Sequence, residues 1–136
     1  MNFELYYQTS GVCTDTRNIQ PDCLFICLKG ANFNGNEFAK KALEEGAKFV
    51  VVDEPEFATN ERIFLVENSL TFLQHLAEHH RFKFSIPIIG ITGSNGKTTI
   101  KEWLSQLLIN DFVVIKNPRS YNSQVGVPLA VWEMAE

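Results

Sequence analysis

The sequence has no apolar stretch long enough to cross a membrane and no excess of basic residues. Its 136 residues include 12 lysines and arginines against 16 aspartates and glutamates, which gives a net charge of −4. A membrane-spanning helix needs about 20 consecutive apolar residues, and non-specific nucleic-acid binding needs a basic surface. Glu4 also stands where the start of a secretory signal peptide would be basic. We therefore expect a cytoplasmic protein without a membrane span and without a nucleic-acid partner.

Cysteine is scarce, and the number of cysteines is odd, which argues against a disulfide framework. The chain has Cys13, Cys23 and Cys27, which we interpret as free thiols in a reducing compartment. Cys23 and Cys27 fall within one predicted strand, where we expect their side chains to face apart rather than to hold zinc. Three histidines share one predicted helix: His75, His79 and His80. Since no acidic or cysteine partner converges on them in the sequence, a solvated helix face is a better interpretation than a metal site.

Apolar runs of strand length alternate with helical patterns in the first part of the chain. The predicted strands cover residues 24–28, 48–52 and 62–66. One helix is expected from Glu37 to a C-terminal cap at Gly46, and another after an N-terminal cap at Asn68 or Ser69. This alternation predicts an α/β fold.

A second alternating unit begins near residue 85. It has a predicted strand over 87–91, a helix after a glycine-rich turn, a strand over 112–115 and a last helix from Val125. We therefore expect a small α/β domain over residues 1–84 and the start of a doubly wound nucleotide-binding domain over 85–136. Such a sheet normally has about five or more strands, so we expect this chain to be the N-terminal piece of a longer protein. Three large apolar side chains should then stay partly uncovered: Trp103, Leu107 and Trp132.

The glycine-rich turn has the chemistry of a phosphate-binding loop. Glycines allow successive backbone N–H groups to converge on one anion, and the helix N-terminus adds the positive end of its dipole. Lys97 would place its charge on the outer phosphates, and Thr98 would offer its hydroxyl to Mg²⁺. The strict pattern asks for Gly where Ile91 stands, and an ordinary turn between a strand and a helix is the alternative. The predicted nucleotide-binding residues are Gly93, Ser94, Asn95, Gly96, Lys97, Thr98 and Thr99.

Three stretches, in order along the chain, resemble the Mur ligases, which join amino acids to the UDP-linked muropeptide precursor of the bacterial cell wall. They are residues 15–38, residues 93–102 and residues 121–129. The first resembles the UDP-binding domain of this family, and the second resembles its ATP-binding loop. One departure is Asn36, where members of the family usually carry His.

The resemblance implies acyl activation in an α/β ligase that uses ATP and Mg²⁺. ATP would phosphorylate the terminal carboxylate of UDP-N-acetylmuramoyl-tripeptide, and the amine of D-alanyl-D-alanine would displace the phosphate. Lys97 would be the catalytic residue that stabilises the transferring phosphoryl group, and Thr98 would be a metal ligand. The residues implied for substrate binding are Thr16, Arg17, Lys29, Gly30, Asn34 and Asn122. The stretch 120–124 also resembles members fused to an alanine racemase.

Other interpretations remain open at this point. Arg17 and Lys29 could be solvated surface residues, and Asn122 could be a turn former that caps the last helix. The function classes to compare are another P-loop enzyme such as a kinase, a folylpolyglutamate synthase-like ligase, and a non-catalytic nucleotide-binding module. Because the acceptor-binding and acidic metal-binding parts are expected beyond residue 136, we expect the 136-residue chain alone to have no ligase activity.

Overall fold

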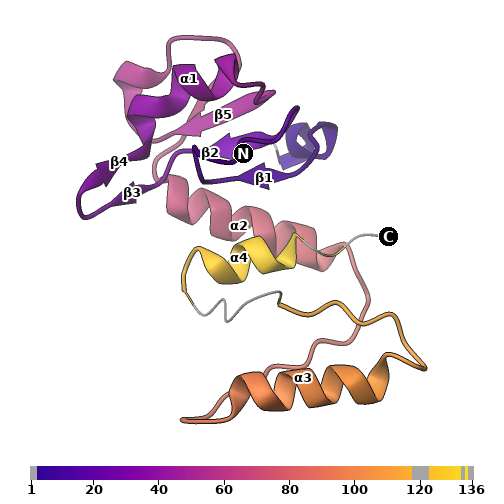
Figure 1. The fold of residues 1–136 in the computed structure, drawn as a ribbon. Coiled ribbons are helices and arrows are strands. Elements are labelled where there is room, and N and C mark those ends of the chain that lie inside the picture. The colour runs from indigo at the N-terminus through magenta and orange to yellow at the C-terminus, as the bar shows by residue number, and fades with distance from the viewer. Residues whose placement is uncertain (1–2, 118–122, 133, 135–136) are drawn as a thin grey trace.

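The computed structural model describes residues 3–117, 123–132 and 134. It is a mixed α/β structure built mainly on a parallel sheet with helices (Figure 1), as the sequence predicts. Within these ranges, no helix has both the length and the apolar character needed to cross a bilayer.

Four parallel strands form the main sheet in the order β1-β2-β5-β6. They are β1 (Val12–Cys13), β2 (Leu24–Ile26), β5 (Phe49–Val52) and β6 (Ile63–Leu65). The register pairs Phe25 with Val50, and Val50 with Ile63. Because side chains alternate between the faces of a strand, these three paired residues share one face. The predicted strands over 24–28, 48–52 and 62–66 are confirmed in shortened form.

Each face of the sheet packs against its own helix. On one face lies α1 (Ala39–Glu44), which follows the 3₁₀ helix η2 (Gly35–Phe38). The buried residues there are Cys23, Phe25, Cys27, Ala39, Ala42, Ala47, Val50, Val52 and Ile63. On the other face lie α2 (Ser69–Phe82) and the 3₁₀ helix η1 (Phe3–Gln8). The buried residues there are Tyr6, Leu24, Ile26, Val51, Phe72, Leu73 and Leu76.

Local signals set the ends of both helices as predicted. Asn68 precedes α2, and its side-chain oxygen accepts a hydrogen bond of 2.8 Å from the Thr71 N–H, which satisfies one of the unpaired donors of the first turn. Gly46 follows the end of α1 with a φ of +110°, a backbone conformation that glycine adopts without a steric penalty.

Cys23 and Cys27 lie in one buried cluster, so the expectation that their side chains face apart is wrong. Residues four apart along an extended strand point to the same face. All three cysteines are free thiols. Among the described residues, no group of three histidine, cysteine or acidic side chains could hold a metal ion.

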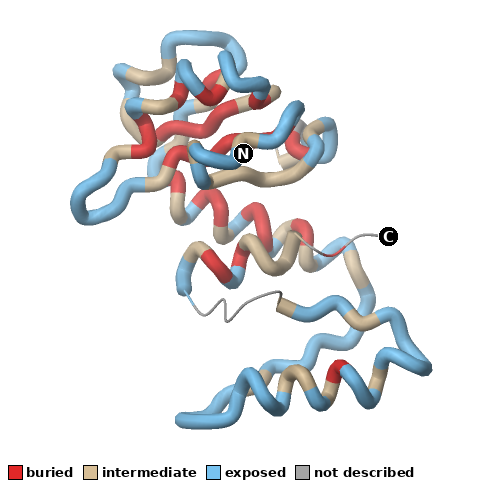
Figure 2. Tube along the Cα trace, in the orientation of Figure 1, coloured by how far each residue is buried: buried red, intermediate tan, exposed pale blue. Residues whose placement is uncertain are grey.

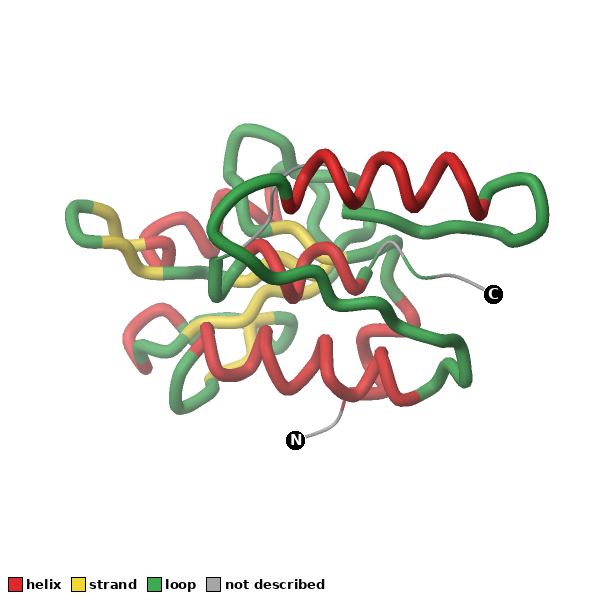
Figure 3. The backbone as a smooth tube through the Cα atoms, turned by 90° about the horizontal axis from the view of Figure 1, so that it is seen from below, coloured by secondary structure: helices red, strands yellow, loops and turns green. Residues whose placement is uncertain are grey.

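α4 (Gly126–Val131) packs along α2, and Figures 1 and 3 both place it between α2 and α3. The Trp132 ring stacks on His80 with 4.2 Å between ring centroids and meets Tyr6 edge-on at 4.7 Å. A ring nitrogen of His80, Nε2, lies 2.9 Å from the Met134 carbonyl oxygen. The prediction of a solvated histidine face is therefore wrong for His80, which the segment after α4 covers.

The two strands predicted after residue 85 are not formed. The structure assigns no strand to residues 87–91 or 112–115, because a strand needs a neighbour for its backbone hydrogen bonds and the described residues supply none there. The helix after the glycine-rich turn does form, as α3 (Lys97–Leu108). Its Trp103 and Leu107 are 64% and 73% exposed, as expected for an apolar face that lacks its sheet (Figure 2).

Two shorter elements complete the first part of the chain. A hairpin of β3 (Lys29–Gly30) and β4 (Phe33–Asn34) follows β2, and η3 (Pro55–Phe57) follows β5. The hairpin returns the chain so closely that a Cβ on Gly35 would lie 2.4 Å from the Leu28 carbonyl oxygen. Only glycine fits this position, which anchors the hairpin next to the end of β2.

Candidate functional site

The glycine-rich turn begins α3 in an exposed position. Gly96 precedes the first helical residue, Lys97, with a φ of +77°, and Gly93 has a φ of +151°. The side-chain ammonium of Lys97 folds back over the turn, donating to the carbonyl oxygen of Gly93 and, at 3.3 Å, to that of Ser94. All seven predicted nucleotide-binding residues, 93–99, are exposed. A helix N-terminus with a lysine above it attracts anions, so the local geometry fits the predicted phosphate-binding role.

The C-terminal side of this loop is tied to the segment that follows α3. Glu102 forms ion pairs with Lys101, at 3.2 Å, and with Lys116. Lys101 also donates to the Asn117 carbonyl oxygen at 2.8 Å. The hydrogen bond from Lys116, followed by that from Lys101, lowers the pKa of Glu102. These contacts hold α3 against Lys116 and Asn117. Asn122, predicted to bind substrate, lies outside the described residues.

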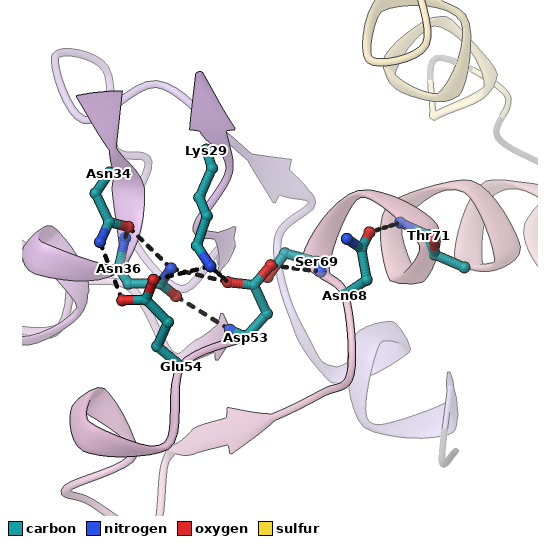
Figure 4. A network of polar contacts seen from close by, with 8 residues as sticks. All are labelled: Lys29, Asn34, Asn36, Asp53, Glu54, Asn68, Ser69 and Thr71. Atoms are coloured by element: carbon teal, nitrogen blue, oxygen red, sulfur yellow. Dashed lines mark hydrogen bonds and ion pairs between the residues drawn. The ribbon is translucent and has the colours of Figure 1, made fainter. Parts of the chain in front are cut away.

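In the first part of the chain, polar residues gather where the parallel strands end (Figure 4). Lys29 lies beyond β2, Asp53 and Glu54 follow β5, and Ser69 begins α2 after β6. The Lys29 ammonium lies 3.0 Å from Asp53 Oδ1 and 2.8 Å from Glu54 Oε1. The hydrogen bonds to Glu54 and then to Asp53 raise the pKa of Lys29. The carboxyl edge of a parallel sheet is where α/β proteins bind their ligands, and two carboxylates hold the Lys29 ammonium at this edge.

Asn36 is the buried centre of this network. It is 0% exposed, and its amide nitrogen donates to Asn34 Oδ1 and to Asp53 Oδ1, both at 2.9 Å. Its amide oxygen accepts the backbone N–H of Asp53 at 3.0 Å. Asn36 and Asp53 therefore each donate a hydrogen bond to the other, and Asn36 also bonds to Asn34, so this network joins the hairpin to the end of β5.

The Asp53 carboxylate stays ionised at this buried position. Burial is the largest single influence and raises its pKa, but the hydrogen bonds from Asn36, Lys29 and the Ser69 N–H together outweigh it and lower the pKa of Asp53. The Ser69 N–H lies 3.2 Å from Asp53 Oδ2. Asp53 thus ties three elements together: the hairpin, β5 and the start of α2 (Figure 4).

The predicted substrate residues fall into two groups. Lys29, Gly30 and Asn34 lie together in the hairpin, and Lys29 and Asn34 share the network above. Thr16 and Arg17 lie in the loop after β1, at the same edge of the sheet, where Arg17 forms a two-point pair with Asp15 at 2.9 and 2.7 Å. Hydrogen bonds from Arg17 lower the pKa of Asp15 to about 2. The Arg17 side chain is 87% exposed, so it is open to a ligand.

Two cavities lie away from these residues. One of about 500 Å³ lies between α2 and α4, and one of about 300 Å³ lies beside η1 under Phe3 and Phe64. Neither is lined by a predicted site residue. The candidate binding groups are therefore on open surfaces at the sheet edge and at the start of α3.

Sequence reasoning did not select Asp53 or Glu54, and it noted Asn36 only as a departure from a family pattern. The signal for the acids was present, since both directly follow the buried strand β5. What the sequence did not carry was their pairing with Lys29, which is 24 residues from Asp53 along the chain.

Two family models match consecutive parts of the chain. Residues 8–81 match the Mur ligase family, catalytic domain, and residues 91–136 match the Mur ligase middle domain. A relative from Synechocystis, named UDP-N-acetylmuramoyl-tripeptide--D-alanyl-D-alanine ligase, is 42% identical over 93% of this chain and 28% of its own length. A relative of the same name from Bacillus subtilis is 40% identical over 96% of this chain and 30% of its own length.

Solved structures agree with the sequence relatives. The MurF ligase from Thermotoga maritima in complex with ADP is 32% identical and superimposes with a TM-score of 0.85 over 100% of this chain and 31% of its own. MurF from Acinetobacter baumannii is 27% identical, with a TM-score of 0.84 over 92% of this chain. The chain thus spans about 30% of the length of the relatives it matches. With more than half of its residues inside the first family match, the chain belongs to the Mur ligase family.

Proposed function

We propose that this chain supplies the UDP-substrate-binding part and the ATP phosphate loop of a ligase that adds D-alanyl-D-alanine to UDP-N-acetylmuramoyl-tripeptide in peptidoglycan precursor synthesis. The observation that carries the proposal is the turn at 93–96, which opens α3 beneath the Lys97 ammonium. Relatives at 40% and 42% identity bear the name of this activity. The proposed domains are residues 1–84 and 85–136, and the proposed location is the cytoplasm.

The reaction would proceed in two steps. The γ-phosphoryl group of ATP passes to the terminal carboxylate oxygen of the tripeptide, which gives an acyl phosphate and ADP. The amine of D-alanyl-D-alanine then attacks the acyl carbon, the new amide bond forms, and inorganic phosphate leaves. Charge neutralisation and positioning dominate such transfers. Lys97 is the residue here that would face the transferring group, after exchanging its contacts with the Gly93 and Ser94 carbonyl oxygens for phosphate oxygens.

The fit to Mg²⁺ is partial. Magnesium prefers oxygen ligands and is usually bound through one or two carboxylates and the phosphates of the nucleotide. Thr98 offers a hydroxyl at the start of α3, but the described residues contain no acidic cluster that would complete a metal site. When bound, Mg²⁺ would neutralise charge on the β- and γ-phosphates. The names of the relatives give the ligase activity alone, so they do not support a fusion to an alanine racemase.

Equilibrium binding tests the substrate class. We expect calorimetric titration of the 136-residue chain to give heat of binding with UDP-N-acetylmuramoyl-tripeptide and with UDP. The reason is that Arg17 and Lys29 offer exposed donors, and Asn34 a half-buried one, at one sheet edge. Folate, the ligand expected of a folylpolyglutamate synthase-like enzyme, should give none. Binding of folate without binding of either UDP ligand would contradict the proposal and favour that alternative.

A further inference from the structure

Glu54 engages both side chains of the β3–β4 hairpin that are proposed to bind the UDP substrate. Its Oε1 lies 2.8 Å from the Lys29 ammonium, and its Oε2 accepts from the Asn34 amide nitrogen at 3.0 Å. Figure 4 shows the carboxylate of Glu54 lying between these two donors. An ammonium and an amide N–H₂ that hold the two oxygens of one carboxylate form an arrangement that would equally hold two phosphate oxygens.

The two acids that contact Lys29 are held very differently. The Asp53 side chain is 8% exposed, and it has further hydrogen bonds from Asn36 and from the Ser69 N–H. The Glu54 side chain is 28% exposed, and its contacts within the described residues are with Lys29 and Asn34 alone. Moving Asp53 away from Lys29 would also break its hydrogen bonds with Asn36 and the Ser69 N–H. Moving Glu54 would break only its contacts with Lys29 and Asn34. Glu54 is the acid that can leave.

The charge of this cluster decides which ligands could take the place of Glu54. Lys29 carries one positive charge against two carboxylates, so the cluster has a formal charge of −1 and repels an approaching anion while Glu54 is in place. A ligand with a single charge gains little by displacing Glu54. A diphosphate presents more negative charge and more acceptor oxygens to the same two donors.

We propose that Glu54 is an internal placeholder for the ligand's diphosphate: it occupies Lys29 and Asn34 in the free protein and is displaced when a nucleoside diphosphate binds. This rests on the proposed function, since it takes the hairpin as part of the UDP-substrate site. Glu54 then lowers the affinity for every anion by the same competition and selects for those with enough charge to displace it. Asp53 remains with Lys29 throughout and keeps its ammonium in position.

Calorimetric titration of UDP and of uridine into Glu54→Gln tests this. The substitution keeps the side-chain length and removes the charge, so UDP should bind about three- to fivefold more tightly than to the unsubstituted chain, while uridine binding should not change. Glu54→Ala, which removes the competing group altogether, should show the same gain. Thermal unfolding of each variant verifies that it is folded.

Two controls separate local competition from general electrostatics. Glu56→Gln removes an equal charge from an exposed position in η3, two residues away, and should leave UDP affinity nearly unchanged. In a Lys29→Met background, Glu54→Gln should lose most of its gain, because the ion pair with Lys29 is the charged one of the two contacts through which Glu54 competes.

The outcomes distinguish this inference from the proposed function. If the unsubstituted chain binds UDP but Glu54→Gln binds it no more tightly, or if the full gain persists without Lys29, the placeholder role is refuted and the proposed function stands. An equal gain in Glu56→Gln also refutes the role. If no form of the chain binds UDP, the proposed function and this inference fall together.

Discussion

Lys97→Ala in the complete gene product is expected to lower the rate of ligation by about 100-fold or more. The substitution removes the only lysine of the 93–99 loop, and with it the charge that would compensate the developing charge on the transferring phosphoryl group. Lys97 is exposed, and within the described part of the chain its side-chain hydrogen bonds go to the loop carbonyl oxygens of Gly93 and Ser94. The loss should therefore appear in turnover and not in folding stability.

The measurement is phosphate release under saturating substrates, with thermal unfolding as a check of the fold. Lys40→Ala is the matched control: it also removes an exposed helical lysine, whose side chain is 86% exposed in α1, and should leave turnover unchanged. Near-normal turnover by Lys97→Ala would sink the assignment of the phosphate loop.

Asn36→Asp is expected to lower the free energy of unfolding by about 3 kcal/mol or more at pH 7. The new carboxylate would take the place of an amide that donates to Asp53 Oδ1 and to Asn34 Oδ1, both at 2.9 Å. Two ionised carboxylates would then face one another at a position that is 0% exposed, and the donor that helps to lower the pKa of Asp53 would be lost.

The pH dependence of the stability loss in Asn36→Asp shows whether repulsion between the two carboxylates causes it. In the unsubstituted chain the folded-state pKa of Asp53 is lowered, so its contribution to stability is complete above its unfolded-state pKa and is lost as the pH falls through the folded-state value. In Asn36→Asp, protonation of one carboxyl relieves the repulsion, so the difference in stability between variant and parent should shrink as the pH is lowered from 7 toward about 4.

Urea unfolding across this pH range measures both the loss of unfolding free energy at pH 7 and its change with pH. Asn60→Asp serves as the control, because Asn60 is exposed and its side-chain oxygen accepts from the Arg62 N–H at 2.9 Å, a role that a carboxylate can keep. Equal effects of the two substitutions, or a loss at Asn36 that does not change with pH, would contradict the role given to the Asn36–Asp53 pair.

In the first part of the chain, the sequence predicted those elements that have strong local signals. The predicted strand over 48–52, which ends in three valines, forms β5, and Asn68 caps α2 as expected. The two-residue strands β1, β3 and β4 were missed, since an alternating pattern cannot be recognised over two positions. The burial of His80 was also missed, because Trp132 and Met134, which cover it, are more than fifty positions away.

After residue 85, the predictions that depend on local contacts are confirmed, and those that depend on distant neighbours are not. Gly96 and the helix from Lys97 were predicted correctly because a turn and a helix satisfy their hydrogen bonds within a few residues. The predicted strand over 87–91 depends on neighbours that the described residues do not provide, and it is absent. Trp103 and Leu107 on α3 are exposed for the same reason, since the described residues provide no strand for them to pack against.

The candidate site also has one part set by neighbouring residues and one part assembled from separate segments. The glycine-rich stretch 93–99 is continuous, so its proposed phosphate-binding role could be predicted from the spacing of its residues. The network of Lys29, Asn34 and Asn36 with the acids after β5 is assembled by the parallel sheet from separate segments. The sequence identified Lys29 and Asn34 only through a resemblance, and the contacts that position them became visible only in the fold.

We propose that the 93–99 loop and the sheet edge belong to one ligase that consumes ATP and a UDP-linked tripeptide. The most direct measurement is phosphate release and product formation by the complete gene product and, side by side, by the 136-residue chain, with ATP, Mg²⁺, UDP-N-acetylmuramoyl-tripeptide and D-alanyl-D-alanine. We predict that the complete gene product releases one phosphate for each amide bond formed, only when all substrates are present, and that the 136-residue chain is inactive. Phosphate release that does not depend on the UDP substrate, or equal turnover by the 136-residue chain, would contradict the account.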